Sequence, residues 1–157
     1  MENLAAILKH NQRSYLLKDL QSTIPLNLAE RKIVEARMTG LSFGQLEEGP
    51  RRVAVDQIMI RAAAICGCIL PNTEFFATFI AEEISIFILQ YGYEELTLEE
   101  ILLAFRLNAK DNADVDYVSF SGSCINVDYV AKILGRYIVQ RKLLDRKFQN
   151  KIDGYEL

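Results

Sequence analysis

The stretch TEFFATFIAEEISIFILQY, residues 73–91, decides the fold class that we expect for this chain. At about 100° of turn per residue, its apolar side chains fall on two faces of a helix. The broader face holds Phe76, Ile80, Ile84, Phe87, Ile88 and Tyr91, and the narrower face holds Phe75, Phe79 and Ile86. A helix that is apolar on two sides is normally enclosed by other helices. The sequence therefore predicts a central apolar helix over 73–91.

Two helices are predicted on the N-terminal side of this segment. The first, over 28–39, begins at Asn27, and Glu30 stands three residues on, as in a capping box. The second begins near Arg52 and ends around Gly67, with apolar residues at helical spacing between them.

Two more helices are predicted on the C-terminal side. Thr97 and Glu100 form a T-x-x-E capping box for a short helix over 98–108. The last helix begins at Asn126 and continues to about residue 150. Between them, 109–124 has no helical rhythm, so we expect an irregular loop with at most one short strand or hairpin arm.

The order of these elements predicts an all-α fold. We expect an orthogonal bundle of about five to six helices around the central helix 73–91. Residues 1–25 carry a weak apolar edge and are predicted to form short helices, as an appendage to one helical domain over 26–157.

Composition bounds the class of protein. The chain has 157 residues, is 50% hydrophobic and carries a net charge of −3, which fits one globular domain and argues against wholesale nucleic-acid binding. No apolar run approaches the roughly 18 residues of a membrane span, since Glu82 and Glu83 interrupt the longest one. An odd number of cysteines without a cleavable leader predicts a reducing compartment, the cytoplasm.

The candidate metal and catalytic residues do not form a site by sequence. Cys66, Cys68 and Cys124 supply three potential ligands, but a zinc site needs four, and free cysteines are commonly buried as small apolar side chains. His10 is the only histidine, and no nucleophile is marked out for it. We therefore expect no metal, no cofactor and no enzymatic activity.

Two acidic groups have alternative readings. Glu82 and Glu83 interrupt the apolar segment, and they either receive an arginine of a partner or mark the seam where the helix reaches solvent, which we favour. Asp111, Asp114 and Asp116 resemble calcium ligands, but the glycine and glutamate of an EF-hand loop are missing, so a solvated acidic loop is expected.

The last predicted helix has the sharpest charge pattern. One sign of charge on an exposed helix binds phosphate backbones or acidic protein surfaces. The alternative is a solvated helix whose cations interact favourably with its C-terminal dipole, or pair within the molecule or between copies with a cluster formed by Glu94, Glu95, Glu99 and Glu100. We take the predicted partner-binding residues to be Lys132, Arg136, Arg141, Lys142, Arg146 and Lys147, joined by Tyr117 and Phe120 in the loop.

The segment 28–46 also resembles the front of a helix-turn-helix, with a turn at Gly40. Arg51, Arg52 and Gln57 would then reach DNA from the next helix. That helix has little polar surface for a groove, which weakens this reading.

The second half of the chain carries a connected set of motifs: GYEELTLEEI over 92–101, AFRLN over 104–108 and NVDYV over 126–130, then Leu134, Tyr137 and Arg141. This half resembles small proteins of Bacteroidetes phages and prophages, which often sit among DNA-replication genes. The resemblance implies a replication accessory protein of the helicase-loader or replisome-adaptor kind, in the cytoplasm of a bacterial host cell. The chain lacks the G-x4-G-K-[ST] phosphate loop, so the implied role is protein binding rather than ATP hydrolysis.

Three functions are consistent with these observations. The first is a non-enzymatic helical adaptor that binds a replication or phage protein, or single-stranded nucleic acid, through the basic last helix. The second is a virion or other self-assembling structural protein that uses its apolar faces for contacts between copies. The third is a helix-turn-helix-like DNA-binding regulator.

Overall fold

The computed structural model describes residues 24–111, 117–119 and 121–155. Its elements are α2 (Leu28–Arg37), a 3₁₀ turn η1 (Phe43–Gln45), α3 (Glu48–Cys66), α4 (Glu74–Gln90), α5 (Leu98–Lys110) and α6 (Val127–Tyr155). Pairing of the β type within these ranges is limited to two isolated bridges, Ser42 with Thr97 and Ile69 with Cys124. The all-α class predicted from the sequence is confirmed.

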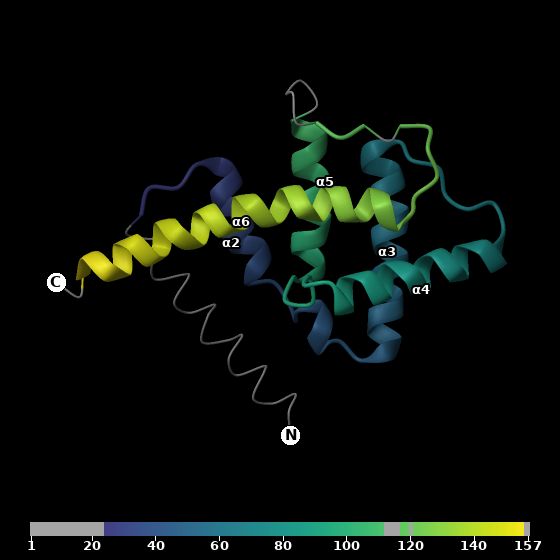
Figure 1. Cartoon of the computed structure of the whole chain (residues 1–157), viewed down its shortest axis with the longest axis horizontal. Helices are drawn as coiled ribbons and strands as arrows, with labels where there is room; N and C mark the ends of the chain where they lie inside the picture. Colours follow the sequence, from purple (N-terminus) through teal and green to yellow (C-terminus); the bar gives the residue numbers. More distant parts are fainter. Residues whose placement is uncertain (1–23, 112–116, 120, 156–157) are drawn as a thin grey trace.

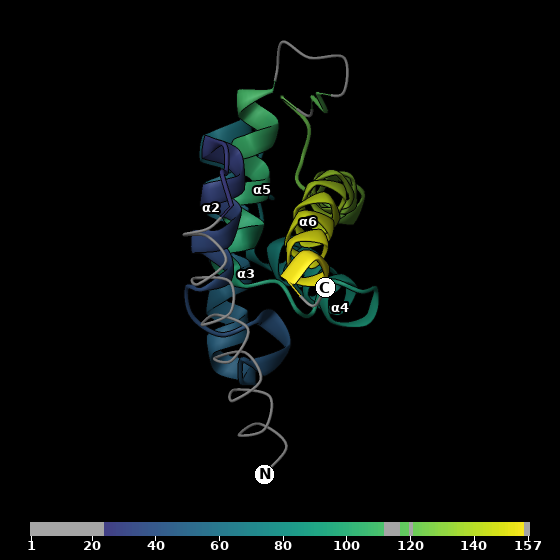
Figure 2. The ribbon, with the colours of Figure 1, turned by 90° about the vertical axis from the view of Figure 1, so that its left-hand side faces the viewer.

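The helices form two layers. Figure 1 shows α2, α3 and α5 running roughly along one direction, with α6 and α4 passing across them in front. In Figure 2, turned by 90°, α6 and α4 lie together on one side and the other three helices on the opposite side. The helix α5 contacts α2, α3 and α6, whereas α4 contacts α3, α6 and η1.

Local sequence signals set the starts of α2, α5 and α6 as predicted, whereas α3 begins at Glu48 and not near Arg52. Asn27 and Glu30 form a reciprocal capping box at α2, and Thr97 and Glu100 form another at α5. The side chain of Asn126 accepts a hydrogen bond from the backbone N–H of Tyr129 at 2.9 Å, which caps α6. These side chains satisfy backbone donors that have no partner inside the helix.

The centre of the fold is α5. Eight of its thirteen residues are buried: Glu100, Ile101, Leu102, Leu103, Ala104, Phe105, Leu107 and Asn108. The ring of Phe105 is fully buried and stacks on Tyr129 of α6, with centroids 5.8 Å apart. This helix holds the two layers together, because α2 and α3 of its own layer and α6 of the other layer pack against it.

The prediction that 73–91 is the enclosed central helix was therefore wrong. In α4 only Ile84 and Ile88 are buried, whereas Phe75 is 73% exposed, Phe76 59% and Phe79 53%. The helix α4 lies in the outer layer, where α3 and α6 cover one side of it and leave the other open. Its apolar residues exceed what its neighbours within the described chain can cover.

The irregular segment after α5 is attached to that helix by hydrogen bonds between the side chain of Asn108 and the backbone of Val118. The side-chain amide of Asn108 donates to the carbonyl of Val118 at 2.9 Å and accepts from its N–H at 3.2 Å. Residues 117–119 are not a strand, and of the predicted loop 109–124 the first two residues belong to α5. Residues 112–116 and 120 lie outside the described ranges.

Ile24, the first residue that the structure describes, is buried in the core. Most of the predicted appendage, residues 1–23, lies outside the described residues, and the proposed boundary at residue 25 stays a prediction.

Candidate docking groove and charged sites

A groove of about 790 Å³ runs between α3 and α4. Its α4 wall is lined by Ala77, Ala81 and Ser85, spaced four residues apart and therefore on one side of the helix. Small side chains at this spacing leave room between the two helices. The floor on the α3 side is formed by Val55 and Met59, which are buried in the core.

Exposed apolar side chains border this groove. Ile60 of α3 is 54% exposed, Leu70 in the connection is 39% exposed, and Ile86 of α4 is 41% exposed. Apolar surface that stays exposed beside a concave site is typical of a place where another molecule binds.

The charges that line the groove are mostly acidic: Glu48, Asp56, Glu74 and Glu82, against Arg51 and Arg52. The guanidinium of Arg51 donates to the carbonyl of Leu46 at 2.7 Å, so part of its hydrogen-bonding capacity is used within the chain. The groove therefore favours a ligand that is apolar on one side and basic at its edges.

The chain reverses direction between the two walls through a short connection. Gly67 ends α3 with φ of +69°, a left-handed conformation that glycine adopts without strain. Thr73 then starts α4, since its side chain accepts a hydrogen bond from the N–H of Phe76 at 3.2 Å. Ile69 pairs with Cys124 in a parallel bridge, which anchors this connection to the start of α6.

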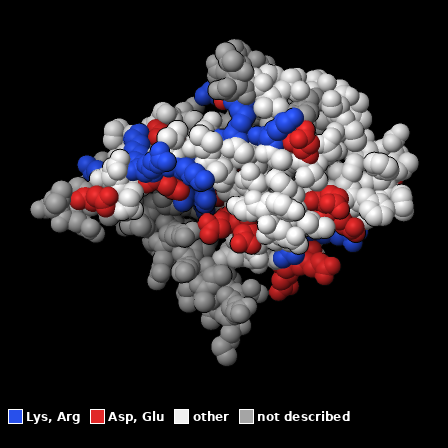
Figure 3. Space-filling model, viewed as in Figure 1, with Lys and Arg blue, Asp and Glu red and all other residues white. Residues whose placement is uncertain are grey.

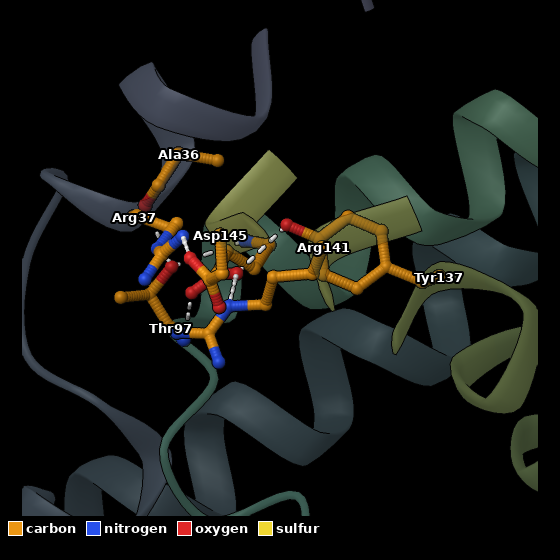
Figure 4. Close-up of polar contacts among 7 residues, drawn as sticks. Ala36, Arg37, Thr97, Tyr137, Arg141 and Asp145 are labelled. Carbon is orange, nitrogen blue, oxygen red and sulfur yellow. Dashed lines mark hydrogen bonds and ion pairs between the residues drawn. The ribbon is translucent and has the colours of Figure 1, made fainter. Parts of the chain in front are cut away.

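A polar cluster lies in the interior around the buried carboxylate of Glu100. Figure 4 labels Thr97, Tyr137 and Arg141 among its members. The hydroxyl of Tyr137 donates to its Oε2 at 2.7 Å, and Nε of Arg141 lies 3.0 Å from the same oxygen. The backbone N–H of Thr97 donates to Oε1 at 3.3 Å, and the Thr97 hydroxyl donates to the carbonyl of Ala36 at 2.7 Å. The cluster thus joins α2, α5 and α6.

Burial dominates the electrostatics of this cluster. Desolvation raises the pKa of Glu100, and the charge of Arg141 opposes that effect. Burial and the neighbouring Glu100 carboxylate raise the pKa of Tyr137 well above its ordinary value. Since both oxygens of Glu100 accept hydrogen bonds within the protein and the side chain is 1% exposed, the arrangement fits a structural contact.

Most of the predicted partner-binding cations of α6 have partners within the chain. Arg141 pairs with Glu100, and Arg136 donates to Asn108 and lies 3.8 Å from Asp111. The remaining two pairs are Lys132 with Asp128 at 3.0 Å and Lys147 with Glu30 at 3.2 Å. The alternative that these charges pair within the molecule is thus realised, and one of the carboxylates, Glu100, belongs to the glutamate cluster that the sequence singled out.

Lys142 and Arg146 differ from the other cations. Both are exposed, and neither has an ion-pair partner among the described residues. Tyr117 is half-buried near the start of α6, and Phe120 lies outside the described residues. The structure therefore separates the predicted set into residues that hold the fold and a smaller group that faces solvent.

The residues considered for metal binding do not form a site in the described part of the chain, where no group of three suitable ligands meets. Cys68 is buried, Cys66 is half-buried and Cys124 is exposed, all as free thiols. Burial raises the pKa of Cys66 and Cys68, which disfavours the thiolate that a metal requires. His10, Asp114 and Asp116 lie outside the described residues.

The connection between α2 and α3 bears on the helix-turn-helix reading. It runs from residue 38 to residue 47 and includes η1, whereas a helix-turn-helix joins its helices by a turn of about three to four residues. The helix α2 packs on α5, and Val55, Ile58 and Met59 of α3 are buried. This arrangement does not favour α3 as a recognition helix.

Comparisons with protein families, with curated proteins and with solved structures find no match to this chain. Among the described helices none has both the length and the apolar character needed to cross a membrane.

The groove was missed in the sequence, although a signal for it exists. Ala77, Ala81 and Ser85 form a line of small residues within an otherwise bulky apolar helix. Such a line indicates a side of α4 where space is left between this helix and a neighbour. Only the structure shows that α3 forms the opposite wall.

Proposed function

We propose that this chain is a non-enzymatic adaptor that binds an amphipathic, basic helical segment of a partner protein in the groove between α3 and α4. The observation that carries the proposal is the pairing of an apolar floor with a mainly acidic edge in one groove of about 790 Å³. Helix-in-groove recognition uses apolar side chains at helical spacing as anchors and charges at the rim for orientation.

The chemistry of the interior supports binding rather than catalysis. The most perturbed carboxylate, Glu100, does not line the groove and has its hydrogen bonds filled by Tyr137 and Thr97. A catalytic site would need polar groups that converge on an open space.

The resemblance of the second half to phage and prophage proteins supplies the proposed setting. A replication protein of the phage or host is the partner that it implies, and this part of the proposal rests on the resemblance alone. The motif residues that carry it, such as Glu100, Tyr137 and Arg141, form the interior cluster. Their arrangement gives them a role in the fold, so the groove rather than the motif is proposed to make the contact.

The test uses a labelled synthetic peptide with leucines at i, i+3, i+4 and i+7 and lysines on the opposite side, titrated with the full chain. We expect Ile60→Asp to raise the Kd of this peptide at least about tenfold, because it places a charge among the apolar anchors. Val53→Asp is the matched control: Val53 lies on the same helix, is 60% exposed and does not line the groove.

Two results would contradict the proposal. One is equal binding by the Ile60→Asp and Val53→Asp variants, which would place the peptide elsewhere. The other is equal binding of a peptide in which glutamates replace the lysines, since the acidic edge should reject it.

A second candidate function, a self-assembling protein, is favoured by a different observation, the exposed phenylalanines of α4 on the side away from α3.

A further inference from the structure

The helices α4 and α6 form the outer layer together and present one continuous face (Figure 1). In that view α4 lies towards the right and the second half of α6 towards the left. Figure 3, from the same side, shows basic side chains concentrated over α6 and acidic side chains over and around α4. The two ends of this face therefore carry opposite charge.

The outward side of α4 combines aromatic side chains with carboxylates. Phe75, Phe79 and Ile86 follow at i, i+4 and i+11 and are 73%, 53% and 41% exposed. Glu82 and Glu83 lie between them on the same side and are exposed. The whole of α4, from Glu74 to Gln90, contains no lysine or arginine.

The outward side of α6 has the same pattern with the opposite sign. Val139 and Leu143 are 59% and 58% exposed, one helical turn apart. Lys142 and Arg146 flank them and have no ion-pair partner in the part of the chain that the structure describes. The outward side of each helix therefore combines apolar residues with charges, and the charges of the two helices are opposite in sign.

This charge pattern selects one arrangement of two copies. In an antiparallel contact of α4 with its own copy, Glu82 and Glu83 at the middle of the helix would face the same carboxylates. A contact of α6 with its own copy would likewise oppose Lys142 and Arg146. Like charges in contact are destabilising, so only α4 against α6 brings opposite charges together.

We propose that two copies of this chain associate through this face about a two-fold axis, with α4 of each copy packed against the second half of α6 of the other. The axis lies in the plane of the face and runs perpendicular to the line from α4 to α6. It places the acidic end of each copy on the basic end of the other, so the α4–α6 contact forms twice in one dimer. Both helices run in the same sense across Figure 1, so the partner's α6 lies antiparallel to α4. Glu82 and Ile86 also line the groove between α3 and α4, so the contact shares part of the groove's rim. The proposal goes beyond the proposed adaptor function because its partner is a second copy of this chain.

Charge reversal tests this arrangement with the full chain. One variant carries Glu82→Lys and Glu83→Lys, and a second carries Lys142→Glu and Arg146→Glu. Either variant alone opposes like charges at both contacts, so its dimer Kd, measured by sedimentation over about 1–100 μM, is expected to rise at least about tenfold.

Mixing the two variants makes the test specific. In a mixed dimer, the reversed α4 meets the reversed α6, and the two unchanged helices meet each other, so both contacts regain opposite charges. We expect the mixture to associate with a Kd close to that of the unaltered chain, and a chain with all four substitutions to do the same. A dimer built on α4 with α4 would leave the α6 variant unaffected, and one built on α6 with α6 would leave the α4 variant unaffected. A loss in both single variants and its recovery in the chain with all four substitutions therefore distinguish the proposed contact from either alternative.

A matched control carries Lys32→Glu and Arg106→Glu, two exposed cations in the other layer. It changes the net charge by the same amount as the α6 variant and should leave the dimer Kd unchanged. Circular dichroism checks that each variant keeps its helices, which is expected because every substituted side chain is exposed. A chain that stays monomeric throughout the concentration range, or reversed variants that associate without a loss or are not rescued by mixing, would overturn the proposal.

Discussion

The helices α4 and α5 are both rich in apolar residues, yet the structure uses them in opposite ways. Eight of the thirteen residues of α5 are buried, whereas two of the seventeen residues of α4 are. The difference lies in the neighbours: α5 packs against three long helices, α2, α3 and α6, whereas α4 packs against α3, α6 and the short turn η1. Apolar composition thus measures what a helix is able to bury, while the number of helices around it decides what is buried within the chain.

The sharpest test of this comparison truncates one phenylalanine in each helix. Phe105→Ala removes a ring that is fully buried and stacked on Tyr129, and we expect it to lower the free energy of unfolding by about 3–5 kcal/mol. Phe79→Ala removes a ring that is 53% exposed and should change the free energy by less than about 1 kcal/mol. Urea denaturation of both variants measures the difference.

These measurements belong at a protein concentration where the chain is monomeric, because self-association would stabilise the unaltered α4 by mass action. Losses of equal size at the two positions would mean that α4 is covered within the monomer, and the contrast between the helices would disappear.

A comparable contrast exists between the glutamates of the two helices. Glu100→Ala leaves Arg141 and the hydroxyl of Tyr137 without their buried acceptor, and we expect a loss of about 3–5 kcal/mol. Glu83→Ala removes an exposed carboxylate and should be close to neutral. Thermal or urea unfolding of both variants checks this. A small effect of Glu100→Ala would show that water or a rearranged side chain replaces the carboxylate.

The pH dependence of stability gives a smaller, signed effect at the same residue. Since burial raises the pKa of Glu100 in the folded state, the folded protein holds this proton more tightly than the unfolded chain. The resulting stability is complete below the ordinary glutamate pKa of 4.5 and is lost as pH rises through the folded pKa.

Glu100→Gln isolates this contribution, because glutamine does not titrate at that position. The stability of the unaltered chain relative to the Gln variant should fall as pH rises above 4.5, in urea unfolding measured across this range. A difference that stays constant or rises with pH would mean that Arg141 outweighs burial and lowers the pKa of Glu100.

The sequence was sufficient to predict the helices but not to predict which of them is buried at the centre of the fold. The capping pairs Asn27–Glu30 and Thr97–Glu100 fix helix starts because their spacing alone satisfies the first backbone donors. Which helix is central depends on contacts between segments far apart in the chain, and periodicity carries no information on these. The two apolar faces of α4 therefore predicted that this helix is buried, whereas most of its side chains are exposed or half-buried in the structure.

The charged residues teach the same distinction. The basic pattern of α6 was readable, but its division into residues that hold the fold and residues that face solvent was not. Arg141 meets Glu100 only because α6 crosses α5 at that point, and Arg136 reaches Asn108 for the same reason. Lys142 and Arg146 lie on the outward side of the same helix, where no described carboxylate approaches.

The N-caps of α5 and α4 allow the two helices to be compared at the level of single hydrogen bonds. Thr97 caps α5, is 1% exposed and also donates to the carbonyl of Ala36, so Thr97→Ala should cost about 1–2 kcal/mol of stability. Thr73 caps α4 at an exposed position, and Thr73→Ala should cost about 0.5–1 kcal/mol. Chemical denaturation of the two variants tests the order, which would be reversed if α4 depended on its cap for lack of other contacts.

The smallest expected effect concerns the exposed ion pair of Lys147 with Glu30. Its two side chains are 41% and 20% exposed, so water and salt screen the attraction, and the coupling free energy in a double-mutant cycle should lie between about 0 and 1 kcal/mol. The cycle with Lys147→Ala, Glu30→Ala and both together measures it, although Glu30 also caps α2 and that contribution cancels within the cycle. A coupling free energy several times larger, which persists at high salt, would mean that Lys147 stabilises the fold as Arg141 does. Of these cations, only Lys142 and Arg146 would then be left for an outside partner.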